Sequence, residues 1–380
     1  MTAVPSRSSA PAPGRVRAAS LDDIDALVTL EEHCFNGDRL SRRSFRRLLT
    51  RSHATVLVHQ SGDDLDGYGI VLFHAGTALS RLYSLAVHPH RRGRGIAQRL
   101  IAALEGAAAG EGCVAMRLEV RRDNTAAQQL YERAGYRIFG AIADYYEDHE
   151  DAVRMERTLE PEGARPPPPA VHYEQTLDFT CGPAALMMGM RRLDPKLPLD
   201  RRLELEIWRE ATTIYMTSGH GGCGPEGLAL AACRRGFGTE VWLKDDTDLF
   251  THAVRSAHKK EVIALVQAHF REQLTAANVP LIYGAITGAD LRARLALGEV
   301  PLVLISSYRL YGDRAPHWVV VAGAEGDLVW LDDPYVDREH NRTPLDSINV
   351  PIARDEFMGM ARYGRSGQRA AVILRRGEVS

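Results

Sequence analysis

Hydrophobic and polar residues along the first 160 positions switch repeatedly between a strand period and a helix period. Residues 54–60 and 67–75 alternate apolar and polar side chains around a Ser-Gly-Asp-Asp turn, a pattern typical of paired strands. Ser20 is a good helix N-cap, and the acidic residues after it favour the first turn of a helix. Gly135 is a good helix end. The other expected elements are helices at 20–34, 41–49, 95–109 and 125–134, and strands at 81–87, 114–121, 136–142 and 153–159.

The pattern after residue 171 differs, because helices come first and strands follow. This order predicts an α+β domain with an antiparallel sheet. The expected helices are 182–193, 201–212, 225–235, 248–258, 261–277 and 287–297, and the expected strands are 300–306, 318–324, 327–331 and 371–374.

A proline-rich stretch at 160–170 separates the two patterns. It holds four consecutive prolines, which cannot join a helix or a central strand and favour a stiff, extended spacer. A chain of 380 residues is also too long for one ordinary core. We therefore expect a disordered tail at 1–14, a domain at 15–159, a linker at 160–170 and a second domain at 171–380.

Composition narrows the class of protein. The apolar fraction of 45% and the charged fraction of 25% are those of a soluble globular protein. A net charge of −2 gives no reason to expect nucleic acid or a membrane as partner. Five scattered Cys residues indicate free thiols in a reducing compartment, and the N-terminus lacks the apolar stretch of a secretory signal. We expect a cytoplasmic protein.

A turn rich in glycine and arginine follows the strand expected at 81–87. It reads Val87-His-Pro-His-Arg-Arg92-Gly-Arg-Gly95-Ile-Ala97 and opens a helix. Glycines let the backbone approach an anion, and the free N–H groups and the helix dipole favour a pyrophosphate. A basic surface turn is the alternative interpretation.

This region resembles the GNAT acyltransferase superfamily, and within it the ribosomal-protein alanine N-acetyltransferases. The resemblance is carried by Arg92-x-x-Gly95-x-Ala97, by the strand before it, by residues 118–136 and by the tail at 145–156. It implies a mixed sheet with flanking helices and acetyl-CoA as cofactor. The implied cofactor-binding residues are Leu85, Ala86, Val87, Arg92, Gly93, Arg94, Gly95, Ile96, Ala97, Asn124 and Tyr131.

Acetyl transfer needs a neutral amine to attack a thioester and an acid to protonate the leaving thiolate. By resemblance, Glu119 is the base, acting through water, Tyr131 is the acid, and Asn124 holds the cofactor arm. The alternatives are a solvated strand carboxylate for Glu119 and a core aromatic for Tyr131. The loop at 35–40 and the tail after residue 142 match less closely, so the acetylated amine stays open.

The second domain carries a set of residues suited to thiol chemistry. Cys181 begins an apolar helix, where a helix N-terminus and a nearby imidazole can lower the pKa of a thiol. Gln175, six residues earlier, can donate to an oxyanion together with a backbone N–H. His317 stands at the start of a strand, and Asp333, just before a proline, can orient its imidazole.

This domain resembles the papain-like cysteine peptidases that cut double-glycine leaders from bacteriocin precursors. The matching pieces are the offset from Gln175 to Cys181, the Cys-Gly-x-Ala-Ala start, His317 before an aromatic residue and three valines, and the pair Asp333-Pro334. Two departures concern the leader-peptide substrate rather than the thiol chemistry. No transporter follows in the chain, and helical additions lie near residues 244–297.

Several other residues are alternative candidates for this site. Cys223 is a rival nucleophile but has Thr217 where a Gln is needed, so we interpret its loop as lining the substrate. His220 and Cys223 lack a second pair of metal ligands, and no metal is expected. Asp332 is the alternative to Asp333 as the residue that orients the imidazole. The three histidines without a constellation, expected at the surface, are His172, His252 and His269.

The sequence thus predicts a bifunctional enzyme, an N-acetyltransferase joined to a cysteine peptidase, with a peptide or protein as substrate. Three alternatives stay open: a second domain that only binds peptide, a ligase or cyclase acting through an acyl-cysteine, and a CoA-sensing first domain.

Overall fold

A computed structural model of the chain describes residues 14–35, 37, 39–50, 53–159, 166–168, 170–213, 221–251, 254–338, 342–364 and 366–377. The chain divides into two compact units, Met1–Glu162 and Gly163–Ser380. Residues 1–13 of the expected tail, most of the linker, and Thr217, His220 and His252 lie outside the described residues.

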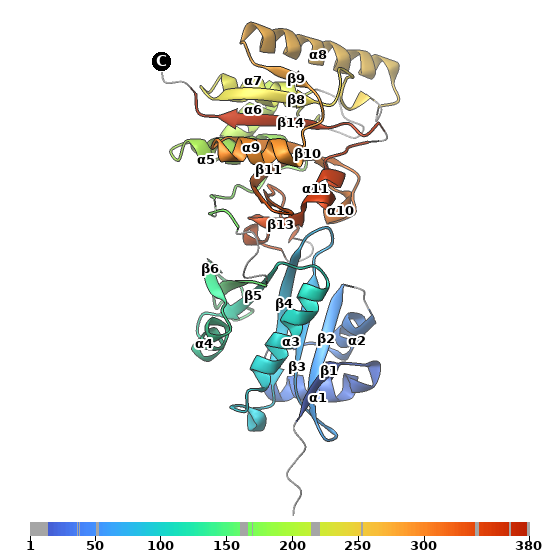
Figure 1. Ribbon diagram of the computed structural model, residues 1–380, viewed down its shortest axis with the longest axis vertical. Coiled ribbons are helices and arrows are strands. Elements are labelled where there is room, and N and C mark those ends of the chain that lie inside the picture. Colours follow the sequence, from blue (N-terminus) through green and yellow to red (C-terminus); the bar gives the residue numbers. More distant parts are fainter. Residues whose placement is uncertain are drawn as a thin grey trace, which may run out of the picture. The chain divides into compact units, whose positions relative to one another are not determined.

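The N-terminal unit is built on a seven-stranded mixed sheet in the order β1-β2-β3-β4-β5-β7-β6 (Figure 1). All neighbours pair antiparallel except β4 and β5, which are parallel. The strands are β1 (Arg15–Ala18), β2 (Ala54–Ser61), β3 (Asp64–Phe73), β4 (Leu79–Val87), β5 (Ala115–Arg121), β6 (Arg137–Ile142) and β7 (Ala152–Thr158), and the helices are α1 (Ile24–Cys34), α2 (Arg42–Thr50), α3 (Ile96–Gly110) and α4 (Thr125–Arg133).

Both faces of this sheet are covered. Val71 of β3 packs in the core under α3, whereas its neighbour Ile70 packs under α1 and α2. Successive side chains of a strand point to opposite faces, so β3 contributes to both cores. Its glycines make room for α3, because a Cβ on Gly69 would lie 2.5 Å from Leu104 Cδ1.

The C-terminal unit has a second seven-stranded sheet in the order β13-β12-β11-β10-β14-β8-β9. Only β8 and β9 pair in parallel. The strands are β8 (Gly238–Leu243), β9 (Leu281–Tyr283), β10 (Val300–Ser306), β11 (Pro316–Glu325), β12 (Leu328–Asp332), β13 (Val350–Ala353) and β14 (Ala370–Arg375), and the helices are α5 (Cys181–Leu193), α6 (Arg201–Ala211), α7 (Pro225–Cys233), α8 (Ala257–Ala276), α9 (Gly288–Ala296), α10 (Tyr308–Tyr311) and α11 (Arg354–Met360).

The two faces of this sheet also have separate cores. Leu302 and Leu304 of β10 pack with α5 and α7 on one face, and Val303 and Ile305 pack with α9 and α11 on the other. A β10 strand buried on both faces explains why it is apolar at every position from Val300 to Ile305.

The predicted fold class is confirmed for both units, with local errors. The helix expected at 248–258 is wrong, because Phe250 has a left-handed φ of 67° and the Ser256 side chain caps α8 by accepting from Lys259 N. The short strands β1, β8, β9 and β13 were not predicted from the sequence. Strands of three to six residues give too few alternations to stand out from their surroundings.

Candidate active sites

Cys181 is the first residue of α5, directly after the N-cap position Thr180. Pro183 fits the first turn because its missing N–H has no partner to lose there. Gly182 allows close packing, since a Cβ at this position would lie 3.2 Å from Cys223 Cβ and 3.2 Å from Trp318 Cδ1. The first turn of α5 leaves backbone N–H groups without a partner in the helix, and these can donate to an anion.

His317 lies buried on β11 between a carboxylate and a thiol. Its Nε2 is 2.6 Å from Asp333 Oδ1, and Cys181 lies close enough to raise the pKa of the imidazole. Burial alone lowers the pKa of His317, but Asp333 and then Cys181 outweigh it and raise that pKa to about 10. The imidazole is therefore protonated at neutral pH.

The Asp333 carboxylate accepts three hydrogen bonds. Besides His317, Tyr311 Oη donates to Oδ2 at 2.7 Å and the Tyr335 backbone N–H donates to Oδ1 at 2.8 Å. Burial raises the pKa of Asp333, but the cationic imidazole and these donors lower it overall. The neighbouring Asp332 instead binds the Arg192 guanidinium and accepts from Asn349 N at 2.9 Å. Of the two aspartates, the structure places Asp333 on the imidazole.

Two tyrosines that were not predicted from the sequence lie beside this histidine. The ring centroids of Tyr311 and Tyr335 lie 6.3 and 6.5 Å from that of His317, and 4.9 Å from each other. Tyr335 could have been suspected because it follows the Asp333-Pro334 pair. Tyr311 lies in α10, six residues before His317, and no local pattern marks it.

Gln175 lies on a segment held against the Asp333-Pro334 pair. Its backbone N–H donates to Pro334 O at 2.9 Å, and His172 Nε2 lies 2.6 Å from Asp333 O. The Gln175 side-chain amide donates to Leu177 O at 2.9 Å. One amide hydrogen is thereby used, and the second is left for another acceptor. The expectation that His172 is a surface residue without a constellation is wrong, because it is half-buried against this site.

Cys223 is buried beside the start of α5, where its thiol is held neutral. Burial, followed by the nearby Cys181, raises the pKa of Cys223 well above its usual range. The Trp318 indole N–H donates to Cys223 O at 3.0 Å, which fixes this residue against β11. A neutral buried thiol is a poor nucleophile. This contrast favours Cys181 as the reactive thiol of the pair.

In the N-terminal unit, β4 pairs with β5 only along the first part of its length. Their pairing covers Leu79 to Arg81, whereas Leu85, Ala86 and Val87 pair with β3 on the other side. The edge of β4 that faces β5 is therefore open to an extended ligand beyond Arg81. Such an edge fits the peptide-like arm of an acyl-CoA.

The glycine-rich turn lies at the end of that open edge. Gly93 and Gly95 have φ values of 76° and 71°, the left-handed region that glycine adopts without strain. Gly95 is the N-cap of α3, and Ile96 and Ala97 are its first residues. The turn and the helix start thus expose backbone N–H groups and a positive dipole end, which fits a pyrophosphate.

The basic residues of this turn are not equivalent. Arg91 is 3.1 Å from Asp66 Oδ1 and is neutralised there. Arg92 donates through Nε to Val87 O at 3.2 Å and stays exposed, as does Arg94. Asn124, predicted to hold the cofactor arm, caps α4 by accepting from Ala127 N at 3.1 Å, which leaves its amide N–H groups for a ligand.

Glu119 of β5 is a buried carboxylate held by two guanidinium groups. Arg81 binds its Oε2 at 2.7 Å, and Arg154 binds its Oε1 at 2.8 Å. Arg81 also donates to Tyr145 Oη at 2.7 Å. Tyr131 of α4 is buried next to Tyr136, and burial raises the pKa of Tyr131, so its hydroxyl keeps its proton at neutral pH.

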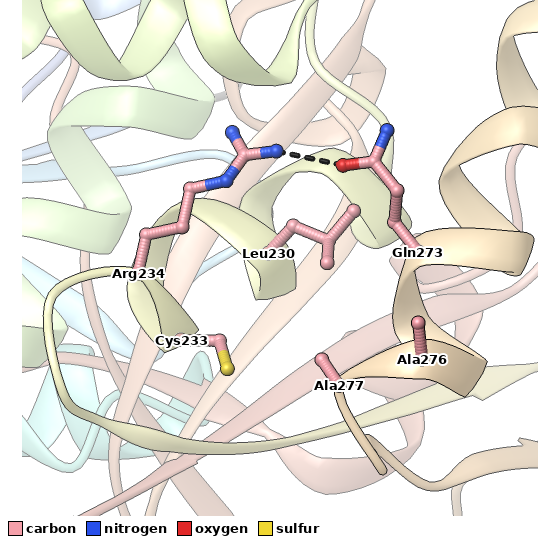
Figure 2. A pocket seen from close by; sticks show the side chains of 6 residues that line it. All are labelled: Leu230, Cys233, Arg234, Gln273, Ala276 and Ala277. Atoms are coloured by element: carbon pink, nitrogen blue, oxygen red, sulfur yellow. Dashed lines mark hydrogen bonds between the residues drawn. The ribbon is translucent and has the colours of Figure 1, made fainter.

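A separate pocket of about 340 Å³ lies between α7 and α8. Figure 2 shows the Arg234 guanidinium donating to Gln273 Oε1, at 2.7 Å, above the apolar side chains of this pocket. Cys233 lines it at the C-terminal end of α7, whereas Cys223 precedes the opposite end of that helix. None of the predicted site residues lines the pocket.

The described residues offer neither a metal centre nor a membrane span. No group of three or more His, Cys, Asp or Glu side chains there could hold a metal ion. None of the helices described combines the length and the apolar character needed to cross a bilayer.

Comparison with known proteins places both units in families. Residues 24–136 match the Acetyltransferase (GNAT) family, whose enzymes use acetyl-CoA. An acetyltransferase of Pectobacterium atrosepticum is 34% identical over 134 residues, which are 33% of this chain and 90% of that protein. An uncharacterized protein of Mycobacterium leprae is 35% identical over 139 residues, 36% of this chain, but the match spans only 38% of that protein.

Among solved structures, the ribosomal-protein-S18-alanine N-acetyltransferase of Escherichia coli is 21% identical to this chain, with a TM-score of 0.37. The likeness covers 40% of this chain and 97% of that structure. Residues 170–375, more than half of the chain, match the Peptidase_C39 like family. The chain is therefore an enzyme that belongs to the GNAT acetyltransferase family through its N-terminal unit and to the Peptidase_C39 like family through its C-terminal unit.

Proposed function

We propose that the chain is a bifunctional enzyme that hydrolyses a peptide bond at Cys181 and acetylates a peptide or protein amine. In the C-terminal unit Cys181 is the nucleophile, His317 the base and acid, Asp333 the group that orients the imidazole, and Gln175 an oxyanion donor. The observation that carries this proposal is the hydrogen bond between His317 and Asp333, with Cys181 at the start of α5 near enough to raise the pKa of the same imidazole.

The proposed hydrolysis proceeds in two steps. The Cys181 thiolate attacks the carbonyl carbon, the π electron pair moves to the oxygen, and Gln175 and the first turn of α5 donate hydrogen bonds to that oxyanion. The C–N bond breaks as the His317 imidazolium gives its proton to the leaving amine. Neutral His317 then takes a proton from water, whose oxygen attacks the thioester, and Cys181 leaves as a thiolate.

This proposal is tested by mass spectrometry of a peptide mixture incubated with the protein. We expect new fragments with wild type and with Cys223→Ala, and none with Cys181→Ala. Because Cys223 is the nearby buried thiol, Cys223→Ala is the matched control. Fragments that persist in Cys181→Ala would reject Cys181 as the nucleophile. Products lacking the added water would indicate ligation or cyclisation instead.

In the N-terminal unit we propose roles for Glu119 and Tyr131. Acetyl-CoA supplies an activated acetyl thioester when bound along β4 and the glycine-rich turn. Two nitrogens of Arg81 occupy Glu119 Oε2, whereas Oε1 binds one nitrogen of Arg154 and keeps a lone pair for a water, which can pass on a proton from the incoming amine. Tyr131, protonated and buried, donates its proton to the leaving sulfur.

We propose further that the two activities act in sequence. Hydrolysis creates a new α-amine, and tethering of the two units raises its local concentration for the acetyltransferase. We expect the whole chain to acetylate a freshly cut peptide faster than an equimolar mixture of a Cys181→Ala chain and a Tyr131→Phe chain. Equal rates would show that tethering contributes nothing.

A further inference from the structure

Glu204 of α6 is a buried carboxylate whose hydrogen-bond donors all flank Gln175. Thr176 N donates to Glu204 Oε1 at 2.8 Å, and Thr176 Oγ1 donates to Oε2 at 2.6 Å. Tyr173 Oη donates to the same Oε2 at 3.0 Å. Within the described part of the chain, no Arg, Lys or His lies within ion-pair distance of this carboxylate.

Burial makes these three hydrogen bonds obligatory. The Glu204 side chain is fully shielded from water, and a buried carboxylate without partners costs several kcal/mol. Tyr173 and Thr176 are therefore fixed relative to α6. Gln175 lies between them, so its backbone is held on both sides.

The same short segment is tied to the catalytic aspartate from its other side. Gln175 N donates to Pro334 O at 2.9 Å, next to Asp333. The Gln175 amide shares its acceptor, Leu177 O, with the Thr180 hydroxyl, and Thr180 directly precedes Cys181. Hydrogen bonds thus tie Gln175 and its neighbours to α6, to Pro334 and to the residues just before α5.

We propose that Glu204 is a positioning residue that sets the Gln175 amide at the oxyanion of the reaction at Cys181. The inference rests on the proposed peptidase function. An oxyanion donor works within about 2.7–3.1 Å of the developing charge, and an error of about 1 Å can cost about a hundredfold in rate. A rigid anchor on a helix supplies that accuracy, whereas the loop alone does not.

The test separates the oxyanion from the thiolate by using two probes on the full-length protein. Iodoacetamide alkylates Cys181 without forming an oxyanion, so its rate reports the thiolate alone. A tripeptide aldehyde ending in glycinal forms a hemithioacetal. The sulfur bonds to the aldehyde carbon, and the oxygen takes the electron pair and then the proton of the His317 imidazolium. Its affinity reports thiolate and oxyanion donors together.

We expect Glu204→Gln to weaken aldehyde binding by about tenfold to a hundredfold while the alkylation rate and its pH profile stay unchanged. Gln175→Ala should give the same pattern, and the double variant should lose no more than the larger single effect. Glu206→Gln is the matched control, because Glu206 lies on the same helix and pairs with exposed Arg202. It should change neither readout.

Three results would overturn the inference: unchanged aldehyde affinity in Glu204→Gln, a parallel loss of alkylation, or effects that multiply with those of Gln175→Ala. If Glu204→Gln does not fold, Thr176→Val removes one of the same hydrogen bonds and should show the pattern at smaller size. A wild-type Cys181 that alkylates no faster than a free thiol would instead reject the proposed peptidase function itself.

Discussion

Each unit holds a buried carboxylate at the centre of its proposed site, and the two differ in what surrounds them. Glu119 is bound by two arginines, at 2.7 and 2.8 Å. Asp333 is bound by one histidine, at 2.6 Å, and by two neutral donors, the Tyr311 hydroxyl and the Tyr335 N–H. A guanidinium never loses its proton in a protein, whereas an imidazole can.

These partners decide what each carboxylate can do. The charges around Glu119 are permanent, so in the proposed mechanism Glu119 acts on a proton through a bound water. The charge beside Asp333 comes and goes with the His317 proton, so Asp333 can tune the reactivity of Cys181.

Asp333→Asn should lower peptide hydrolysis by about a thousandfold or more, because the imidazole loses both its orientation and its stabilised charge. Alkylation of Cys181 at neutral pH should slow as well. Asp332→Asn is the control, since Asp332 binds Arg192 and Asn349 instead. If hydrolysis fell equally in both variants, Asp333 would have no special role.

Tyr131→Phe should lower the kcat of acetyl transfer by about a hundredfold, the usual contribution of a general acid, with little change in the KM for acetyl-CoA. Steady-state kinetics with an acceptor peptide would measure both constants. Tyr136→Phe removes the hydroxyl of a neighbouring ring, whose centroid lies 5.7 Å from that of Tyr131, and should leave kcat nearly intact. Undiminished kcat in Tyr131→Phe would remove Tyr131 from the mechanism.

Tyr311→Phe should lower hydrolysis by about threefold to tenfold, the effect of one lost hydrogen bond. With one donor fewer, more charge on Asp333 faces His317, so the pKa of His317 should rise further. The pKa of the His317 imidazole, followed by NMR against pH, should then lie above that of wild type. Tyr308→Phe alters a half-exposed tyrosine of the same short helix and should change nothing.

The thermal stability of wild type relative to Asp333→Asn should depend on pH. The folded pKa of His317, about 10, exceeds its ordinary value of 6.5, so its pairing stabilises the fold fully below about pH 6.5 and is lost as pH rises through 10. The pKa of Asp333 is lowered, so its contribution is lost only in acid. The Tm difference should shrink between pH 7 and 10 by on the order of a few degrees. A constant difference would contradict the pairing.

The sequence located the candidate residues that carry local signals. Cys181 stands before an apolar helix, His317 at a strand start and Asp333 before a proline, and the structure brings these three together. The choice between Asp332 and Asp333 depended on which way each side chain points at the end of β12. Only the folded register decides that.

The supporting residues could not be predicted, because their contacts join distant segments. Glu204 meets Thr176 across 28 positions, and Tyr311 meets Asp333 across 22. Neither pair has a spacing that recurs in a helix or strand. The two arginines on Glu119 likewise come from β4 and β7, and only the strand order β4-β5-β7 brings them to it.

A single mass-spectrometric experiment tests whether this chain both cuts a peptide and acetylates an amine. A peptide mixture is incubated with wild-type protein, with and without acetyl-CoA, beside Cys181→Ala and Tyr131→Phe. The account predicts new fragments that need Cys181 and carry acetylated N-termini only when acetyl-CoA and Tyr131 are present. Acetylation of intact peptides without any cleavage would contradict it and leave the C-terminal unit as a binding module.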